Sequence, residues 1–327
     1  MNKLTKIGVS ALCGSLAAVS SANAGSLAVT GGATATYTSL QGEVTGNPLG
    51  MASAMTFTGN GELDNGSTFT LSIAHTNKAA YTGSAISLTT PSLGTFKYDE
   101  GGGTGLDRID DMMPTAWEEV DGTGLGMGLR TVAGAGGSSD IEWTVGMGLP
   151  EGMNLHASFS PRPDGSKNAN KGVSGPSATI VGNGWDVVVT HNGLYEGLNI
   201  FAGMSTIDQA SGLGDNDQEA YGATFAIGGA TLGYQYSKNE NPGVSGEYYE
   251  NDAYGVSFSL NDDLSISYGL HKSKRNSTGT ELEGESIQVS YSVGGASIKF
   301  AESKVDNQNY VSGTNRDGRT VALTLAF

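Results

Sequence analysis

Short alternating segments recur along the chain, and helical periodicity is almost absent. The last ten residues, "GRTVALTLAF", place Val321, Leu323, Leu325 and Phe327 on one face of an extended strand and Thr or Ala on the other. Successive side chains of a strand point to opposite faces. One face of this segment therefore suits an apolar medium, and the other tolerates water.

The same alternation predicts sixteen strands. Their apolar positions begin in "SLAVTGGATATYT" and "MASAMTFTGN" and continue to the segments around residues 254–260, 264–270, 287–293 and 298–300. The opposite faces carry Thr, Ser, Ala, Gly and Gln, as in Thr231, Gly233, Gln235 and Ser237. A β-sandwich shows a similar alternation, so period alone does not separate the two architectures.

The connections separate them, because their lengths alternate. Tight turns such as "DNG" (64–66), "PEG" (150–152) and "GG" (294–295) alternate with longer polar connections. The longer connections are 39–50, 101–137, 161–183, 208–217, 240–249, 276–280 and 306–316. Only residues 78–82 break the alternation, because this connection is short where a long one is expected. This parity predicts an all-β fold: a sixteen-stranded antiparallel up-and-down transmembrane β-barrel with one elaborated and one trimmed rim. An even strand count lets the last strand pair with the first, which removes edges that hydrocarbon cannot hydrogen-bond.

Tyrosines gather near the strand ends on the side of the long connections, where a ring that is part apolar and part polar suits a membrane interface. The predicted belt comprises Tyr37, Tyr98, Tyr221, Tyr236, Tyr248, Tyr249, Tyr254 and Tyr310.

Residues 1–24 have the composition of a cleaved signal peptide. Lys3 and Lys6 precede a short apolar run, and Ala22 and Ala24 form an A-x-A-type site. We therefore expect export across the inner membrane of a Gram-negative bacterium and a single barrel domain over residues 25–327. After residue 24 no apolar run reaches 18 residues, so we expect no transmembrane helix.

Charge and motifs exclude several functions. The chain has 33 acidic and 17 basic residues, a formal charge of −16, which does not suit nucleic acid as a partner. It has no G-x-S-x-G motif, and after residue 24 no Cys and four His on separate strands (His75, His156, His191 and His271). We expect neither enzymatic activity nor a cofactor.

The long third connection, residues 101–137, is the candidate functional segment. Connections of this length are usually functional or disordered. Asp107 or Asp110 suits a helix N-cap, Pro114 suits a first helical turn, and Trp117 is an apolar anchor, so we expect the loop to contain a short helix and to pack against the barrel wall. Its candidate pore-lining residues are Asp107, Arg108, Asp110, Asp111, Glu118 and Glu119.

Strand phase also predicts charged residues on the lumen wall, because a lipid-facing Arg or Lys costs ~2–4 kcal/mol at the bilayer midplane. The predicted inward set is Lys97, Glu142, His156, Asp186, His271 and Lys299. Facing rows of acids and bases would create a transverse field that selects ions. The alternative is that the loop acids are solvated or paired, for example Asp107 and Asp111 with Arg108.

The acid excess suggests a pore that favours cations or neutral solutes. A separate acidic group, Asp215, Asp217 and Glu219, would hold a hard divalent cation or simply form a solvated loop. We expect no other metal site.

Taken together, the leader ending at Ala24, the sixteen alternating strands, the third-loop core "GLDRIDDMMP–WEE" and terminal Phe327 resemble the bacterial general porins of the alphaproteobacterial type. The resemblance covers residues 25–327. It implies a third loop folded into the lumen, a C-terminal aromatic residue read by the outer-membrane assembly machinery, and a homotrimer.

The sequence thus favours a porin of the outer membrane, a passive diffusion channel for small polar solutes and ions whose selectivity is set at the third loop. The alternative is a plugged barrel that acts as a surface scaffold or adhesin. A third possibility is a soluble β-sandwich.

Overall fold

The computed structural model describes residues 25–41, 46–77, 82–164 and 177–327. The predicted signal peptide lies outside the described residues. Sixteen strands are present in the described chain: β1 (Leu27–Leu40), β2 (Leu49–Glu62), β3 (Thr68–Thr76), β4 (Gly83–Thr90), β5 (Gly94–Asp99), β6 (Asp140–Val145), β7 (Met153–Ser160), β8 (Ile180–His191), β9 (Leu198–Gln209), β10 (Asn216–Ile227), β11 (Ala230–Glu240), β12 (Tyr248–Ser259), β13 (Leu264–Arg275), β14 (Glu281–Val293), β15 (Ala296–Asp306) and β16 (Arg316–Ala326).

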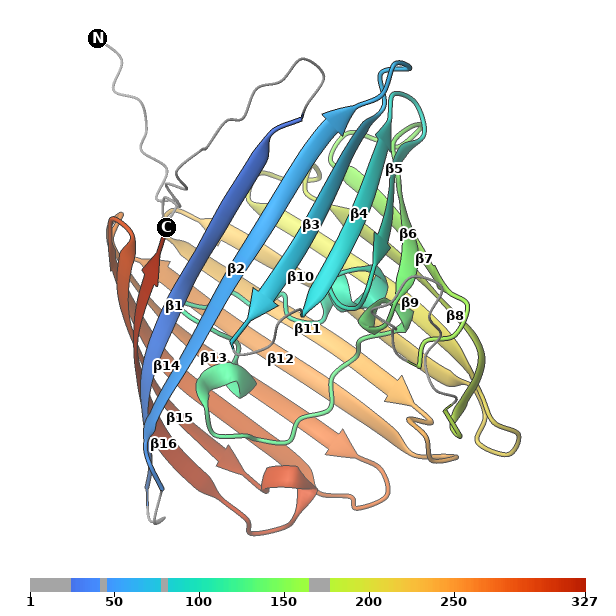
Figure 1. The fold of residues 1–327 in the computed structure, drawn as a ribbon. Helices are drawn as coiled ribbons and strands as arrows, with labels where there is room; N and C mark the ends of the chain where they lie inside the picture. Colours follow the sequence, from blue (N-terminus) through green and yellow to red (C-terminus); the bar gives the residue numbers. More distant parts are fainter. Residues whose placement is uncertain (1–24, 42–45, 78–81, 165–176) are drawn as a thin grey trace.

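The strands form one closed antiparallel barrel in which each strand pairs with its sequence neighbours (Figure 1). β1 closes the sheet by pairing with both β2 and β16, with Gly32 opposite Ala326 and Thr38 opposite Thr320. Phe327 extends this closure, since its N–H donates to the Gly31 carbonyl oxygen at 2.9 Å. The predicted sixteen-stranded up-and-down barrel is confirmed.

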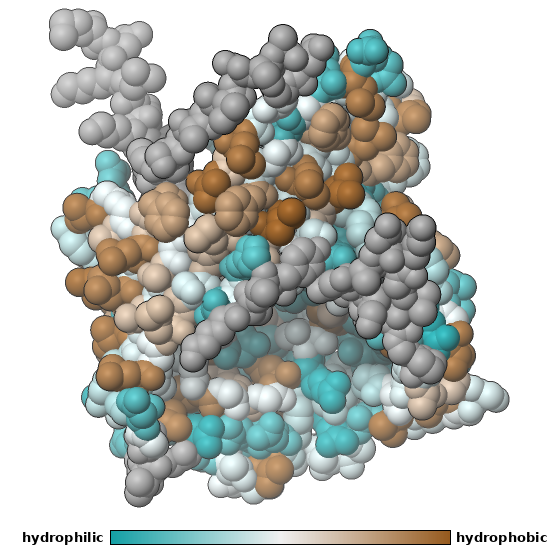
Figure 2. All heavy atoms as spheres, in the orientation of Figure 1, coloured by the Kyte–Doolittle hydropathy of each residue, from teal (hydrophilic) through white to brown (hydrophobic). Residues whose placement is uncertain are grey.

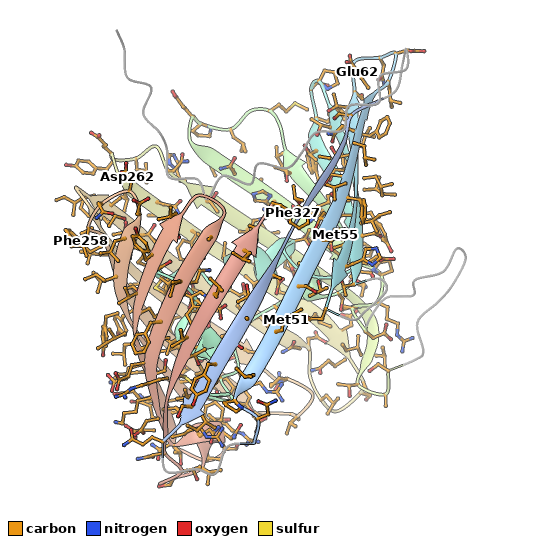
Figure 3. All side chains as sticks on the ribbon, turned by 60° about the vertical axis from the view of Figure 1, so that its left-hand side comes forward. Met51, Met55, Glu62, Phe258, Asp262 and Phe327 are labelled. Carbon is orange, nitrogen blue, oxygen red and sulfur yellow. The ribbon has the colours of Figure 1, made fainter. Side chains whose placement is uncertain are left out.

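The two rims differ as predicted from the connection lengths. Short turns join β2 to β3 and β12 to β13, and Glu62 and Asp262 mark them on the upper rim in Figure 3. The β5–β6 connection on the opposite rim, residues 100–139, contains three short 3₁₀ helices: η1 (Gly105–Ile109), η2 (Val120–Thr123) and η3 (Ala135–Gly137). A fourth, η4 (Gln308–Tyr310), joins β15 to β16. We refer to residues 100–139 as the inner loop.

The outward faces of the strands are apolar and exposed. Ile287, Ile298, Leu323 and Met51 are among these side chains, and Met51 is 75% exposed. In Figure 2, hydrophobic residues gather over the upper part of the barrel, and hydrophilic residues lie mainly toward the lower rim. A continuous exposed apolar surface of this kind is typical of a lipid-facing barrel. None of the described helices is long and apolar enough to cross a membrane.

The tyrosine belt differs from its prediction at two residues. Tyr249 and Tyr310 are only 4% and 5% exposed, because Tyr249 points inward from β12 and Tyr310 lies in η4. Their assignment to the membrane interface is wrong. By contrast, Tyr234 and Tyr268 do point outward, and their hydroxyls donate to Asp252 Oδ1 at 2.7 Å and Glu285 Oε2 at 2.9 Å.

Substitution of an outward residue tests the lipid-facing assignment. We expect Leu323→Arg to destabilise the barrel by ~2–4 kcal/mol where the residue lies near the bilayer midplane. Thr324→Arg, one position along but on the inward face, should cost much less because its charge reaches water. Urea unfolding in phospholipid vesicles measures both; equal destabilisation would contradict the assignment.

Candidate functional site

The inner loop lies inside the barrel, between the near and far walls in Figure 1. Within the described chain, the hydrogen bonds of loop residues 104–136 to side chains of the wall reach β6, β8, β10–β14 and β16, all through inward-facing residues. The loop therefore follows more than half of the wall from the inside. The outgoing limb, residues 104–122, and the return limb, residues 123–139, take different paths along it.

The loop enters and leaves through close backbone approaches that require glycine. Gly105 has φ +51°, and a Cβ there would lie 2.0 Å from Asp186 Oδ2. Gly134 has φ +61°, and its Cβ would lie 2.6 Å from the same oxygen. Both positions favour glycine for conformational and steric reasons. They bring both limbs of the loop to one carboxylate.

Asp186 anchors both limbs. Its carboxylate accepts three backbone N–H groups at 2.9 Å: Leu106 from the outgoing limb, and Ala135 and Gly136 from the return limb. The residue is 1% exposed. Hydrogen bonds to a charged acceptor are stronger than neutral ones. Asp186 is thus the main link between the two limbs and β8.

A second group of charged residues, on β6 and β7, holds η1. Glu142 accepts the Gly105 N–H at 2.8 Å and forms a salt bridge with Arg108. His156 Nδ1 lies 3.5 Å from Glu142 Oε1 and 2.9 Å from the Thr144 hydroxyl. Arg108 therefore pairs with the wall instead of with Asp107 or Asp111, the pairing considered from the sequence.

The helical signals of the loop were misassigned. The N-cap residues are Thr104 for η1 and Glu119 for η2, and neither makes a side-chain cap. Asp107 instead lies within η1, where its carboxylate accepts the Gly103 N–H at 2.6 Å. Pro114 lies outside all three helices. The predictions of Asp107 or Asp110 as a cap and of Pro114 in a first turn are wrong, because these segments are single 3₁₀ turns bound to the wall.

The outgoing limb is held by polar wall side chains that the sequence reasoning did not single out. Gln235 on β11 accepts the Met112 N–H and donates to the Asp110 carbonyl oxygen at 2.8 Å. Gln288 on β14 accepts two N–H groups, from Trp117 at 3.1 Å and Glu118 at 3.0 Å, and donates to the Glu118 carbonyl oxygen at 2.7 Å. A glutamine on an inward face of a strand is the sequence signal that would have indicated them.

The return limb is held in the same way. Its carbonyl oxygens accept from Thr320 (Thr123 at 2.9 Å), Arg316 (Leu125 at 2.9 Å), Gln308 (Gly126 at 2.6 Å) and Asn251 (Arg130 at 3.0 Å). Gln218 accepts the N–H groups of Ala133 and Gly134. Both limbs of the loop are thus hydrogen-bonded to the wall along their length.

Inward glycines make room for the loop on the far wall. A Cβ on Gly233 would lie 2.4 Å from Pro114, one on Gly269 2.6 Å from Val120, and one on Gly284 2.5 Å from the Met127 sulfur. Gly255, between Gly233 and Gly269 in register, would also contact Pro114. The absence of side chains at these four positions lets the loop approach β11–β14 closely.

Apolar contacts complete the packing between loop and wall. One buried cluster joins Leu106, Ile109, Met113 and Val132 of the loop to Val188, Phe201, Ala220 and Ala253 of the wall. A second joins Val120, Leu125 and Met127 to Tyr249, Leu282, Val305 and Tyr310. Burial of such side chains contributes roughly 1.5–3 kcal/mol each.

Several bases near the loop have partners, whereas several loop carboxylates are exposed. Lys97 pairs with Asp99 at 2.7 Å, Arg108 with Glu142, and Lys299 Nζ lies 6.0 Å from the centre of the Trp117 ring. By contrast, Asp111, Glu118 and Asp121 are exposed in the barrel interior, and Asp110 and Glu119 are half-buried.

Burial raises the pKa values of several loop acids. It raises the pKa of Glu119 to about 7, with Asp121 and Asp111 adding to the effect and the Met113 N–H opposing it. The pKa of Asp110 rises to about 8 through burial and the nearby Asp107 and Asp111 carboxylates. Burial also raises the pKa values of Asp107 and Glu118.

The group Asp215, Asp217 and Glu219 does not assemble a metal site. Asp217 and Glu219 point outward from β10, and Asp217 Oδ1 accepts the Thr206 hydroxyl at 2.8 Å. In the described chain, no three His, Cys, Asp or Glu side chains are placed to hold a metal ion together. Asp217 and Glu219 therefore belong to the outer face of a strand and not to the solvated loop considered from the sequence.

Comparison with known proteins agrees with the architecture. The family model described as Gram-negative porin matches residues 8–326. Similar solved structures include Salmonella typhi OmpF in complex with daunomycin (TM-score 0.71, 14% identity, covering 93% of this chain and 98% of that chain). An anion-selective porin from Comamonas acidovorans (0.67, 12%, 92% and 99%) and a mutant of Rh. blastica porin (0.62, 16%, 92% and 100%) are also similar. No curated protein matches the sequence.

Neutralising Asp186 tests its anchoring role. Asp186→Asn replaces one accepting oxygen by an N–H₂ group that faces backbone donors. We expect this to lower the free energy of local opening by roughly 1–3 kcal/mol, so that the amides of Leu106, Ala135 and Gly136 exchange hydrogen about fivefold faster or more. Hydrogen–deuterium exchange with mass spectrometry measures this. The outward Asp252→Asn is the matched control; unchanged exchange in Asp186→Asn would contradict the assignment.

Proposed function

The chain belongs to the Gram-negative porin family, whose members are outer-membrane channels, and we propose that it is a passive diffusion channel whose narrowest part is formed by the inner loop. The observation that carries the proposal is the asymmetric course of the loop. Its wall contacts run from β6 to β16 and reach Thr38 and Leu40 at the end of β1, and its exposed acids lie on the side away from these contacts. The permeation path would then run between the loop and the wall of β2–β5.

The inward positions of β1–β4 carry almost no charge, so this wall does not balance the negative charge of the loop acids. The inward positions of β1–β4 are Thr, Ser, Ala, Gly, Asn and Leu, with Glu62 at the trimmed rim. The hydroxyls there also pair with each other, as in Thr34 with Thr324 at 2.9 Å. Because Lys97 and Arg108 are ion-paired, and the exposed loop acids Asp111, Glu118 and Asp121 outnumber the exposed loop base Arg130, we infer a preference for cations and neutral polar solutes. The fold alone does not set this sign, since the similar Comamonas porin is anion-selective.

The charged residues of the loop and wall have three different roles in the proposed channel. Asp111 and Glu118, with Asp121, would supply the field of the constriction, and Asp110 and Glu119 would modulate it. Asp107, Arg108, Glu142, His156 and Asp186 would position the loop. Lys97, Lys299 and His271 would contribute to the lumen wall.

Export and assembly are part of the proposal. Residues 1–24 would be removed during export. The terminal Phe327, 53% exposed at the end of β16 (Figure 3), would be read by the assembly machinery. Small outward residues on β1, Gly31, Ala33 and Ala35, next to Met51 and Met55 on β2, would form the contact of a homotrimer; chemical cross-linking in vesicles tests this.

Liposome swelling and bilayer recording test the channel and its selectivity together. We expect swelling with a small sugar and, under a NaCl gradient, a reversal potential that favours Na⁺. Asp111→Asn/Glu118→Gln/Asp121→Asn should lower the Na⁺/Cl⁻ permeability ratio by about threefold or more. The outward control Glu219→Gln/Glu250→Gln/Glu302→Gln removes equal charge and should change it little. Absence of swelling would favour the plugged-barrel alternative.

The selectivity should also depend on pH. Carboxylates lose negative charge as pH falls, and the raised pKa values of Glu119, about 7, and Asp110, about 8, place part of this loss between about pH 9 and pH 6. We expect the Na⁺/Cl⁻ permeability ratio to fall over that range. Reversal potentials at each pH measure it, and Asp110→Asn/Glu119→Gln should flatten the dependence; a wild-type ratio constant from pH 9 to pH 6 would contradict this prediction.

A further inference from the structure

A cavity of about 450 Å³ lies between the two limbs of the inner loop and β13. We call it the loop pocket; it is lined by Asp111, Trp117, Glu118, Glu119, Asp121 and His271, among others, with Thr131 contributed by the return limb. It is half-open, and its volume lies within the range of small-molecule sites. His271, which lines the pocket, points inward from β13, so the pocket belongs to the barrel interior.

The charge of the pocket has one sign. Its lining includes five carboxylates, because Asp110 also contributes, and neither Lys nor Arg is among the described residues that line it. The nearest base is Lys299, whose ammonium lies 6.0 Å from the centre of the Trp117 ring and interacts electrostatically with Glu118. A compact cation would therefore find five carboxylates, with one base at the edge of the group.

His271 provides an independent indication of a ligand. It is 5% exposed, and its Nε2 has no hydrogen-bond partner within the described chain. A buried polar atom without a partner costs roughly 1–3 kcal/mol, and native structures contain few of them. Since this ring lines the pocket, a polar group bound there would complete its hydrogen bonding.

The apolar part of the lining indicates the kind of cation. Trp117 and Met113 lie beside the carboxylates, and an indole ring attracts both an aliphatic stem and a cationic head. A single metal ion suits the pocket less well, because the volume of the pocket is many times the ~30 Å³ of one water molecule. In the described part of the chain, no three His, Cys, Asp or Glu side chains are placed to hold a metal ion together.

We propose that the loop pocket binds a small organic cation, with its ammonium or guanidinium group among Glu118, Glu119, Asp121 and His271 and its apolar stem against Trp117. This rests on the proposed channel function and names a solute class for it. Such solutes would be held next to the permeation path before crossing, which raises their local concentration.

Butylammonium is the probe. Its effect on the Na⁺ current is measured in planar bilayers that contain NaCl and the protein without residues 1–24. We expect saturable block of the Na⁺ current by butylammonium and none by butyrate, which has the same stem and the opposite charge. Glu118→Gln/Asp121→Asn should raise the half-blocking concentration about tenfold or more, and Trp117→Leu about threefold. The outward Glu219→Gln/Glu302→Gln, which removes the same charge, and the outward Trp185→Leu are matched controls and should leave it unchanged.

The outcomes separate the pocket from the channel. No NaCl conductance in the wild-type protein would overturn the proposed function itself. Normal conductance without saturable block by butylammonium would overturn only the pocket. Block by Mg²⁺ that is as strong as that by butylammonium and insensitive to Trp117→Leu would also overturn it, since the site would then recognise charge alone. Each variant is first shown to be folded by its own NaCl conductance and heat-modifiable migration on a gel.

Discussion

The structure depends on one constraint: in hydrocarbon, every backbone N–H and C=O must find a partner within the protein. A closed antiparallel sheet meets it because each strand pairs on both sides, and here β1 supplies the final pairing with β16. The hydrogen bonds between Gly31 and Phe327 extend that pairing to the C-terminal residue. Closure then fixes which side chains face lipid and which face the lumen, and it creates the enclosed space in which a loop can be bound.

The same requirement governs the inner loop, which is irregular backbone held inside the barrel. Its N–H and C=O groups are satisfied by side chains of the wall, above all Asp186, Gln235 and Gln288. Glycines on β11–β14 let it approach closely, and two apolar clusters fill the space behind it. A loop attached in this way has a defined position, so the side chains on its free surface have defined positions too. That is the physical basis for treating its acids as a constriction.

Electrostatics distinguish this barrel interior from a balanced acid–base passage. Strand phase and the loop charges predicted facing rows of acids and bases across the lumen. The ion pairs decide the outcome, however: Arg108 pairs with Glu142 and Lys97 with Asp99, whereas Asp111, Glu118 and Asp121 remain exposed. Which base meets which acid depends on how the loop lies, and neither strand phase nor spacing encodes that.

The sequence by itself determined the number of strands, the parity of the rims, the closure of the sheet and the inward or outward direction of most side chains. These follow from a local period of two residues and from the need to leave no edge unpaired. Only the tertiary structure decided the course of the inner loop, the caps of its short helices, the inward turn of Tyr249 and Tyr310, and the loop pocket over His271. These features rest on contacts between residues far apart in the chain, such as Arg316 with the Leu125 carbonyl oxygen, 191 positions away. No periodic pattern records a contact of that kind, because it exists only after the barrel has closed.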